Sequence, residues 1–350
     1  MRWSQQAITE RDSNALDGLE QTAPLIGALQ SPEFASATFL EVATKSALNR
    51  VPGDDGVMAG AWTINPYRGC QHACVYCFAR NTHTYLDLDA GNDFDSKIIV
   101  KTNIAQVLEH ELRTGKHAVR HVNLGTNTDP YQRAEGKYEL MPPILRALAS
   151  HGVGISVLTK GTLLRRDIPL LQQLAREVPV SVSLSIAVFD SELQRSVEPG
   201  TPSTAARLAT VIALRDAGIP CAVFVMPVMP GLTDSASQLM EAASQIKQAG
   251  ASSALYSALH LRPGAKEWFA AWLHREHPEL VPLYAKIYGK QSIASRAYKS
   301  ALRERALGAF AAHDLLPGST STPGQHARAL HVNTRRGANN IGTRSEARLF

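Results

Sequence analysis

The feature that most constrains the fold of this chain is a regular alternation of short apolar strand patterns and helical patterns. Strands are predicted at 120–125, 154–159, 179–187, 219–226 and 253–260, with helices between them at 142–151, 167–177, 203–217 and 234–249. Repeated strand–helix units predict a parallel sheet, because each helix returns the chain to the edge of the sheet where the next strand begins.

Residues that start and stop helices support these boundaries. Asp167 and Asp234 precede two of the helices, where a short polar side chain can cap free backbone N–H groups. Gly152, Gly218 and Gly250 follow helix ends, where glycine adopts the left-handed conformation that closes a helix. The sequence therefore predicts a fold of α/β class.

The strand within 179–187 has two unlike faces. Alternate residues on one face are apolar, and those on the other are serines: Val180, Val182, Leu184 and Ile186 against Ser181, Ser183 and Ser185. A row of small polar side chains suits the interior of a barrel with room for a ligand. A first strand near Trp62 brings the count to about six units, which predicts a partial (β/α)6 barrel of the TIM type.

The segments outside this core are less regular. A helix is predicted near Phe39 to Asn49, and another at 291–313. From Leu316 the chain is polar and basic, with five arginines against one glutamate, as in solvated tails. The expected organisation is an N-terminal extension and linker (1–59), a barrel core (60–290), and a helical segment with a basic tail (291–350).

Composition narrows the class of protein without identifying a partner. The 350 residues are 44% hydrophobic and 19% charged, which is ordinary for a water-soluble protein. No apolar run is as long as a membrane span, and the N-terminus lacks the apolar core of an export signal. We therefore expect no membrane partner and a cytoplasmic location. The net charge of +5 is compatible with a nucleic-acid partner, but charge alone does not select one.

Three cysteines give the sharpest chemical signal. Cys70, Cys74 and Cys77 form the pattern C-x3-C-x2-C, and Tyr76 stands just before the third. Three thiolates on one loop can hold three irons of a cubic iron–sulfur cluster and leave the fourth iron open. An open iron can bind a small molecule, so the spacing favours catalysis over simple electron storage.

A structural zinc site is the alternative interpretation of this motif. Zinc sites usually pair two cysteine knuckles, and the sequence has no second knuckle. His72 is too near its neighbours in sequence to complete a tetrahedron easily, whereas His83 could be a fourth ligand. Cys221 lies in an apolar run and is expected to be a buried thiol.

Polar residues gather where the predicted strands end. The segment Gly125 to Asp129 follows the first of these strands, and Lys160 follows the second. Ligands of parallel barrels bind at the C-terminal ends of strands, so these residues are candidates for holding an organic ligand. Turn formation explains each residue equally well when it is taken singly.

The sequence segments around and after the cysteines resemble those of a known family. Four segments are similar to those of the radical S-adenosylmethionine (SAM) enzymes: TINPYRGCQHACVYCFAR, LGTNTDPYQ, VLTKG and FVMPVMPGLTD. They are most similar to the spore photoproduct lyase-like branch, whose members are often labelled DNA repair photolyases. The resemblance extends from about Phe39 to about Tyr288.

The resemblance implies a set of site residues and cofactors. Cys70, Cys74 and Cys77 would hold a [4Fe-4S] cluster whose open iron chelates SAM. The residues that would contact SAM are Tyr76, beside the adenine, and the strand-end residues Thr126, Lys160, Ser183 and Ser185. A flavodoxin- or ferredoxin-like reductant would supply the electron that cleaves SAM to a 5′-deoxyadenosyl radical.

The resemblance does not extend to the lyase reaction. Spore photoproduct lyase uses a further cysteine as hydrogen donor, and here the only spare cysteine is Cys221. Because Cys221 opens the strand 219–226, we expect it at the opposite end of the barrel from the ligand. The substrate is therefore open, with nucleic acid a candidate. A zinc-stabilised nucleic-acid-binding protein without radical chemistry is the alternative function.

Two groups of charged residues have weaker functional interpretations. Arg68 and the pair Arg165–Arg166 could form a basic rim for a phosphate backbone, although surface charges are the more common explanation. Glu198 and Arg207 are expected either to form a structural ion pair or to help line the cofactor site.

Overall fold

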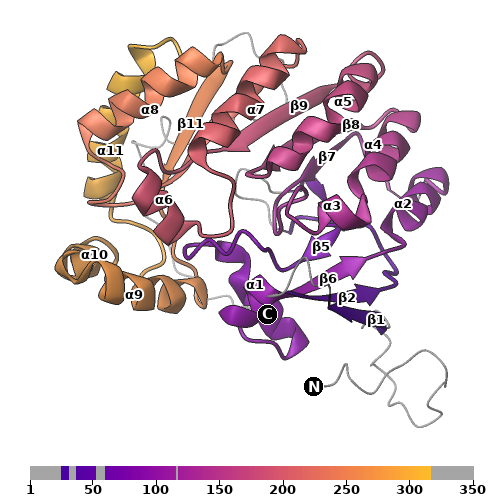
Figure 1. The fold of residues 1–350 in the computed structure, drawn as a ribbon, viewed down its shortest axis with the longest axis horizontal. Helices are drawn as coiled ribbons and strands as arrows, with labels where there is room; N and C mark the ends of the chain where they lie inside the picture. The colour runs from indigo at the N-terminus through magenta and orange to yellow at the C-terminus, as the bar shows by residue number, and fades with distance from the viewer. Residues whose placement is uncertain (1–24, 31–36, 53–59, 116, 317–350) are drawn as a thin grey trace, which may run out of the picture.

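The fold is built on a curved, seven-stranded sheet (Figure 1). The computed structural model describes residues 25–30, 37–52, 60–115 and 117–316. In spatial order the strands are β11 (Ser253–Ala258), β10 (Cys221–Val228), β9 (Val180–Ser185), β8 (Gly154–Thr159), β7 (His121–Leu124), β4 (Trp62–Ile64) and β3 (Leu48–Arg50). The six strands from β4 to β11 are parallel, and β3 is antiparallel at the edge. The predicted partial (β/α)6 barrel is confirmed.

Four helices return the chain between successive strands and follow one another around the outside of the sheet (Figure 1). They are α4 (Met141–Ser150), α5 (Ile168–Leu174), α7 (Thr204–Asp216) and α8 (Ala236–Ala249). Shorter elements in the same loops are α3 (Glu135–Tyr138), the 3-10 helix η4 (Thr162–Asp167) and α6 (Ser191–Val197). The four helices predicted between the barrel strands all form within a few residues of their expected bounds.

The two faces of the sheet have different environments. Ile155 and Val157 of β8, with Val182 and Leu184 of β9, belong to the main apolar core that the helices cover. The opposite face carries Ser156 and Leu158 on β8 and the predicted serines on β9. This second face is the barrel interior, because Leu158 and Ser185 line a cavity there.

The capping predictions were right for the glycines and wrong for the aspartates. Gly152, Gly218 and Gly250 adopt positive φ angles of 69°, 73° and 80° after their helices. Asp167 precedes α5, but its carboxylate accepts from Arg166 and caps no N–H. Helix α8 begins at Ala236, and its N-cap is Ser235 rather than Asp234; Ser235 forms a reciprocal capping box with the helix.

The predicted helix at 39–49 does not form. Instead β2 (Thr38–Val42) pairs in parallel with β6 (Lys97–Lys101). With β1 (Leu25–Gln30) and β5 (Tyr67–Arg68) they make a second sheet in the order β1-β2-β6-β5. The apolar residues of 39–49 fit a helical period, but pairing with a strand about 60 residues later gives Phe39 a buried position between the sheets.

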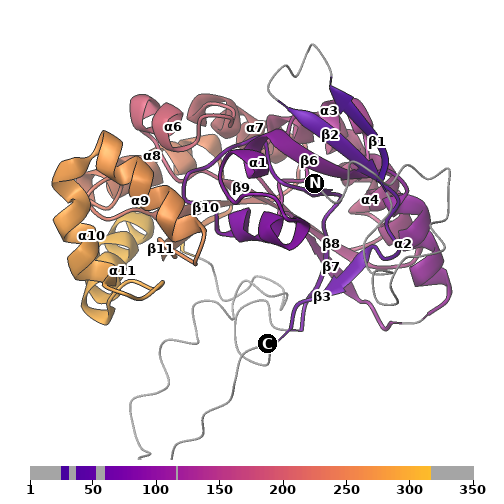
Figure 2. The same ribbon diagram turned by 90° about the horizontal axis from the view of Figure 1, so that it is seen from below.

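The C-terminal helices lie across the molecule from strands β1 and β2 (Figure 2). These helices are α9 (Ala265–Glu276), η5 (Pro278–Leu280), α10 (Val281–Tyr288) and α11 (Arg296–Ala311). Helix α11 confirms the helix predicted within 291–313 and packs against α8 and β11. The basic tail beyond Leu316 lies outside the described residues, and the domain boundaries at 59 and 290 stay predictions. Among the described helices, none has the length and apolar character needed to cross a bilayer.

Candidate functional site

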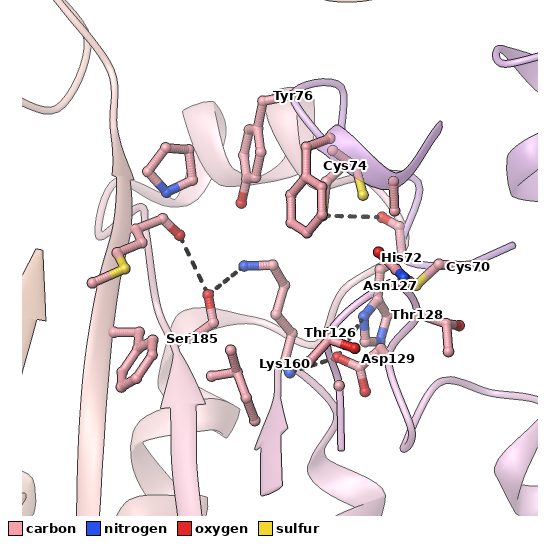
Figure 3. Close-up of a pocket in the computed structure, with 18 of the residues that line it drawn as sticks. Cys70, His72, Cys74, Tyr76, Thr126, Asn127, Thr128, Asp129, Lys160 and Ser185 are labelled. Carbon is pink, nitrogen blue, oxygen red and sulfur yellow. Dashed lines mark hydrogen bonds and ion pairs between the residues drawn. The ribbon is translucent and has the colours of Figure 1, made fainter. Parts of the chain in front are cut away.

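A cavity of about 310 Å³ opens between the cysteine loop and the C-terminal ends of the barrel strands (Figure 3). Cys70, Cys74 and Cys77 line one wall. Lys160 and Ser185, at the ends of β8 and β9, lie across the cavity from Tyr76 and Cys74 (Figure 3). The position matches the general rule that ligands of parallel barrels bind at the carboxyl ends of strands.

The three cysteines are free thiols in a dry environment. Cys70 and Cys74 are buried and Cys77 is half-buried. Burial raises the pKa of each thiol, because a thiolate loses its hydration there. Among the described residues, no three His, Cys, Asp or Glu side chains converge closely enough to hold one metal ion. Three thiols on one cavity wall match the three protein ligands of a cubic cluster with one open iron.

The histidine that could complete a zinc site is engaged elsewhere. His83 belongs to the 3-10 helix η3 (Phe78–Leu86), and its Nε2 lies 2.9 Å from the carbonyl oxygen of Lys97. Its ring packs edge-on against Phe94, with the centroids 5.1 Å apart. His83 is thus part of the support beneath the loop, and it is not among the residues that line the cavity.

Backbone hydrogen bonds hold the cysteine loop from two sides. The carbonyl oxygen of Gly69 accepts from Thr128 Oγ1 at 2.7 Å and from Gln132 Nε2 at 3.2 Å. Gln132 Oε1 in turn accepts from the N–H of Gln71 at 3.0 Å. These bonds tie the loop to the segment after β7 and satisfy polar groups that would otherwise be buried without partners.

On its other side the loop meets the segment between α6 and α7. Gly200 N–H donates to the carbonyl of His72, and Val75 N–H donates to the carbonyl of Val197, both at 3.0 Å. A Cβ atom added to Gly200 would lie 1.9 Å from the carbonyl oxygen of Gln71. Only glycine permits this approach, so residues 198–201 hold the cysteine loop in place from this side.

Asp129 organises the strand ends below the loop. Its carboxylate accepts from Thr159 Oγ1 at 2.5 Å and from the N–H of Lys160 at 2.7 Å, and it lies 3.3 Å from His72 Nδ1. Burial alone would raise the pKa of Asp129, but the His72 ring and these hydrogen bonds outweigh it and lower the pKa. The carboxylate therefore fixes the backbone of Lys160, from which the lysine side chain extends into the cavity.

A buried charge network lies behind the cavity wall that carries Lys160, the one charged member of the network that lines the cavity. Glu198 has no exposed surface and pairs with Arg207 Nη2 at 2.8 Å and Lys160 Nζ at 3.3 Å. It also accepts from the Tyr76 hydroxyl. Burial would raise the pKa of Glu198, yet the two cations lower it to about 2. Lys160 Nζ also donates to Ser185 Oγ at 2.5 Å, which directs the ammonium toward the cavity.

Two cations therefore face one carboxylate at this wall. The formal charge of Lys160, Arg207 and Glu198 sums to one positive charge, held beside Cys74 and Tyr76. Glu198 and Arg207 form the predicted ion pair. Neither is among the residues that line the cavity, whereas their partner Lys160 is. The wall favours an anionic group on whatever ligand the cavity holds.

The remaining sequence-predicted residues divide between the site and the rest of the fold. Thr126 lines the cavity and its hydroxyl donates to Asn65 Oδ1 at 3.3 Å. Ser183 is buried in β9 but is not among the lining residues. Cys221 begins β10, at the other end of the strand from the cavity, as expected. It is buried, and burial raises its pKa to about 12.

The three arginines that could form a basic rim lie on two separate elements, as expected of surface charges and ion-pair partners. Arg166 is committed to carboxylates, with its Nη2 2.7 Å from Glu135 Oε1 and its Nε 2.8 Å from Asp167 Oδ1. Arg68 lies on β5 of the second sheet, and Arg165 is exposed on η4. Neither Arg68 nor Arg166 is among the residues that line the cavity.

Several residues of the site had no sequence signal strong enough to identify them. In the sequence His72 is marked only as a possible zinc ligand, and no local pattern marks Gln132 or Arg80. His260, at the end of β11, also lines the cavity. Asp129 and His72 are far apart in the chain, so only the fold shows that they meet. The sequence indicates a role for Arg80 only through its place in CFAR, the segment that begins with the third cysteine.

Comparisons with solved structures agree on the fold. A mutant of spore photoproduct lyase matches with a TM-score of 0.59 and 15% identity, covering 84% of this chain and 86% of that one. Another mutant, with dinucleoside spore photoproduct, matches with a TM-score of 0.57 and 14% identity, covering 80% of each chain. At such identities the likeness concerns the arrangement of the backbone.

Comparisons of sequence reach closer relatives. An uncharacterised protein of Mycobacterium tuberculosis is 48% identical over 94% of this chain and 98% of its own length. An uncharacterised protein of Methanocaldococcus jannaschii is 27% identical over 56% of this chain and 69% of its own. The family model described as "Radical SAM superfamily" matches residues 64–243, which contain the cysteine loop and the strand ends at Thr126, Lys160 and Ser185. With that match over half of its length, this chain belongs to the radical SAM superfamily.

Proposed function

We propose that this protein uses Cys70, Cys74 and Cys77 to hold a [4Fe-4S] cluster and cleaves SAM in the adjoining cavity, with a substrate that is still to be identified. The observation that carries the proposal is the placement of the three thiols opposite Lys160 in one cavity. Family membership implies the cluster and SAM, and the cavity brings the cluster ligands and polar strand ends within one enclosure.

The residues present fit these cofactors. Three cysteines line the cavity and the fourth, Cys221, lies elsewhere, so one iron would lack a protein thiolate. The excess positive charge at Lys160 suits the carboxylate of SAM, while Thr126 and Ser185 offer hydroxyls nearby. The hydroxyl of Tyr76 is already bonded to Glu198, so Tyr76 would contact the adenine through its ring or backbone.

When bound, the reduced cluster supplies the electron that cleaves SAM to methionine and a 5′-deoxyadenosyl radical. The chain contributes orientation and exclusion of water. Lys160, fixed by Ser185 and Glu198, would hold the carboxylate, and the loop clamped by Gly200 would hold the thiols in place. Phe224 and Met226 line an apolar part of the cavity, which would shield the reaction from solvent.

The substrate proposal is narrower than the family resemblance. Some solved spore photoproduct lyases hold dinucleoside spore photoproduct, which makes a nucleic-acid component a substrate class to test here. The spare cysteine lies at the opposite end of β10 from the cavity, so a lyase reaction with a cysteine hydrogen donor is not part of the proposal. A flavodoxin- or ferredoxin-like reductant and a cytoplasmic location complete the proposed setting.

Anaerobic reconstitution tests the proposal. The protein should become brown and carry about four irons and four sulfides per chain, the composition of one cluster. Dithionite and SAM should then give 5′-deoxyadenosine and methionine. An intact cluster that yields no 5′-deoxyadenosine contradicts the proposal. A colourless protein with one zinc per chain and salt-sensitive binding to DNA or RNA would instead establish the zinc-stabilised alternative.

Lys160→Met separates the role of the lysine from that of the cluster. Loss of a charged hydrogen bond to a carboxylate should weaken SAM binding at least about 10-fold. The visible absorption of the cluster should not change, since Lys160 is not a ligand. Equilibrium binding of SAM to the oxidised, cluster-loaded protein measures the effect, and unchanged affinity would remove Lys160 from the proposed site.

A further inference from the structure

Arg80 lies three residues after Cys77 and has no exposed surface. Its Nε and Nη2 atoms donate to the carbonyl oxygen of Cys74, at 3.1 and 3.0 Å. Its Nη1 donates to the carbonyl oxygens of Ala90 and Gly91, at 3.2 and 2.9 Å. The same side chain therefore binds the backbone of a proposed cluster ligand and the turn that follows η3.

A carboxylate completes the surroundings of this guanidinium. Arg80 Nη2 donates to both oxygens of Asp95, at 3.0 and 2.9 Å, in helix α1 (Asn92–Ser96). Every nitrogen of Arg80 thus has an acceptor, which is the condition for burying a guanidinium without a large loss of stability. Burial raises the pKa of Asp95 to about 6, although the Arg80 charge opposes the rise.

Two aromatic rings enclose the guanidinium. Its carbon lies 5.3 Å from the centroid of Phe94 and 5.0 Å from that of Trp268. Trp268 belongs to α9, which lies outside the residues that the family model matches. A Cβ atom added to Gly91 would approach Trp268 to 2.5 Å, so the turn and α9 are packed closely. Arg80 therefore joins the cysteine loop to the C-terminal helices.

We propose that Arg80 is a positioning residue for the iron–sulfur cluster: it fixes the Cys74–Cys77 segment and places a buried positive charge beside it. The proposal rests on the proposed function of the three cysteines. A lysine could supply the charge but not the paired donation to the Cys74 carbonyl, because only the guanidinium forms a planar fork. Charge and hydrogen bonding near a cluster both set its reduction potential.

The charge argument gives opposite predictions for the two members of the ion pair. Arg80→Gln removes a positive charge and leaves Asp95 beside the loop, so the reduction potential should become more negative. Asp95→Asn leaves the Arg80 charge unopposed, so the potential should become more positive. A purely structural anchor would not produce shifts of opposite sign.

The fork argument concerns retention of the cluster. Arg80→Lys and Arg80→Gln should both release iron to a chelator about 10-fold faster than the unchanged protein, the effect of losing a residue that supports a metal ligand. Trp268→Leu should act in the same direction through the loss of stacking. Arg275→Gln is the matched control, since Arg275 is an exposed arginine in α9 that pairs with the adjacent Glu276.

The experiment measures iron per chain, the rate of iron release and the midpoint potential of each anaerobically reconstituted variant. If Arg80→Gln does not fold, Asp95→Asn and Trp268→Leu still decide the outcome. Opposite potential shifts with faster iron release support the proposal. Potentials and release rates equal to those of the Arg275→Gln control overturn it. A wild-type chain that binds no cluster contradicts the proposed function itself, which distinguishes the two failures.

Discussion

The two ends of the barrel differ in the kind of polar group that they hold. At the C-terminal ends of the strands, Glu198, Arg207 and Lys160 form a network of formal charges beside the cysteine loop. Toward the N-terminal ends, His121 Nε2, Ser156 Oγ and Ser181 Oγ form a chain at 2.7 and 2.6 Å. Glu198 and Arg207 come from the end of α6 and from α7, whereas His121, Ser156 and Ser181 belong to strands of the sheet.

The difference indicates which end was shaped for chemistry. Burying charged groups costs stability unless every charge is paired, and well-packed apolar residues often serve stability better. Hydroxyls that bond one another fill an interior at lower cost. Among the described residues of the barrel, the buried charge network lies at the end next to the three thiols, which a ligand explains best. Packing is sufficient to explain the serine chain at the other end.

Cysteine substitutions give the largest expected contrast between the two ends. Cys70→Ala, Cys74→Ala and Cys77→Ala should each abolish the visible absorption of the cluster and the cleavage of SAM, because each removes a proposed ligand. Cys221→Ala, at the start of β10, should leave both unchanged. Absorption spectra and iron content check this. Loss of SAM cleavage in Cys221→Ala with an intact cluster would mean that the N-terminal end of the barrel takes part in the reaction.

Glu198→Gln should have the next largest effect. The change leaves Arg207 buried without its counter-ion, which should cost about 3 kcal/mol of unfolding free energy. Urea unfolding of the apo-protein measures it. Glu192→Gln, an exposed change on α6, should alter stability by no more than about 0.5 kcal/mol. Equal costs for the two variants would show that the charge network is not a special feature of this end.

The pH dependence of stability follows from the same carboxylate. The pKa of Glu198 is about 2 in the folded protein, against an ordinary value of 4.5. The folded state thus binds fewer protons than the unfolded state, so the stabilisation is complete above pH 4.5 and is lost as pH falls toward 2. Between pH 5 and pH 3, the stability difference between wild type and Glu198→Gln should shrink by about 2 kcal/mol. A difference independent of pH would contradict this assignment.

Ser181→Ala should give the smallest effect. It removes one hydroxyl from the neutral chain and should cost about 1 kcal/mol, with no change in 5′-deoxyadenosine yield. Thermal unfolding and a SAM-cleavage assay under the same conditions test both halves. A yield that falls as far as it does in Lys160→Met would show that the two ends of the barrel act together.

The barrel strands were predictable because each carries its own local signal. The strand at 154–159 forms with the expected bounds, between a helix-ending glycine and a lysine that enters the cavity. The second sheet was not predictable in this way. The local sequence around strand β2 predicts a helix. The extended conformation becomes more stable only through pairing with β6, which is distant in the chain.

The candidate site shows the same division. The cysteine spacing and the strand-end positions of Lys160 and Thr126 were visible in the sequence. Asp129 lies against His72, which is 57 residues earlier in the chain. Glu198 accepts a hydrogen bond from Tyr76, which is 122 residues earlier. No local pattern predicts such pairs, because their energies depend on burial and distance.

The sequence by itself determined the parallel α/β core, the cluster-type cysteine loop and the end of the barrel where they meet, since these follow from short-range spacing and periodicity. Only the tertiary structure decided which polar residues surround the loop. Ser183 does not line the cavity. Arg80 donates to the carbonyl of Cys74 and stacks on Trp268, which belongs to the distant helix α9. The physical reason is that buried charges and hydrogen bonds are stabilised only by partners that long-range packing supplies.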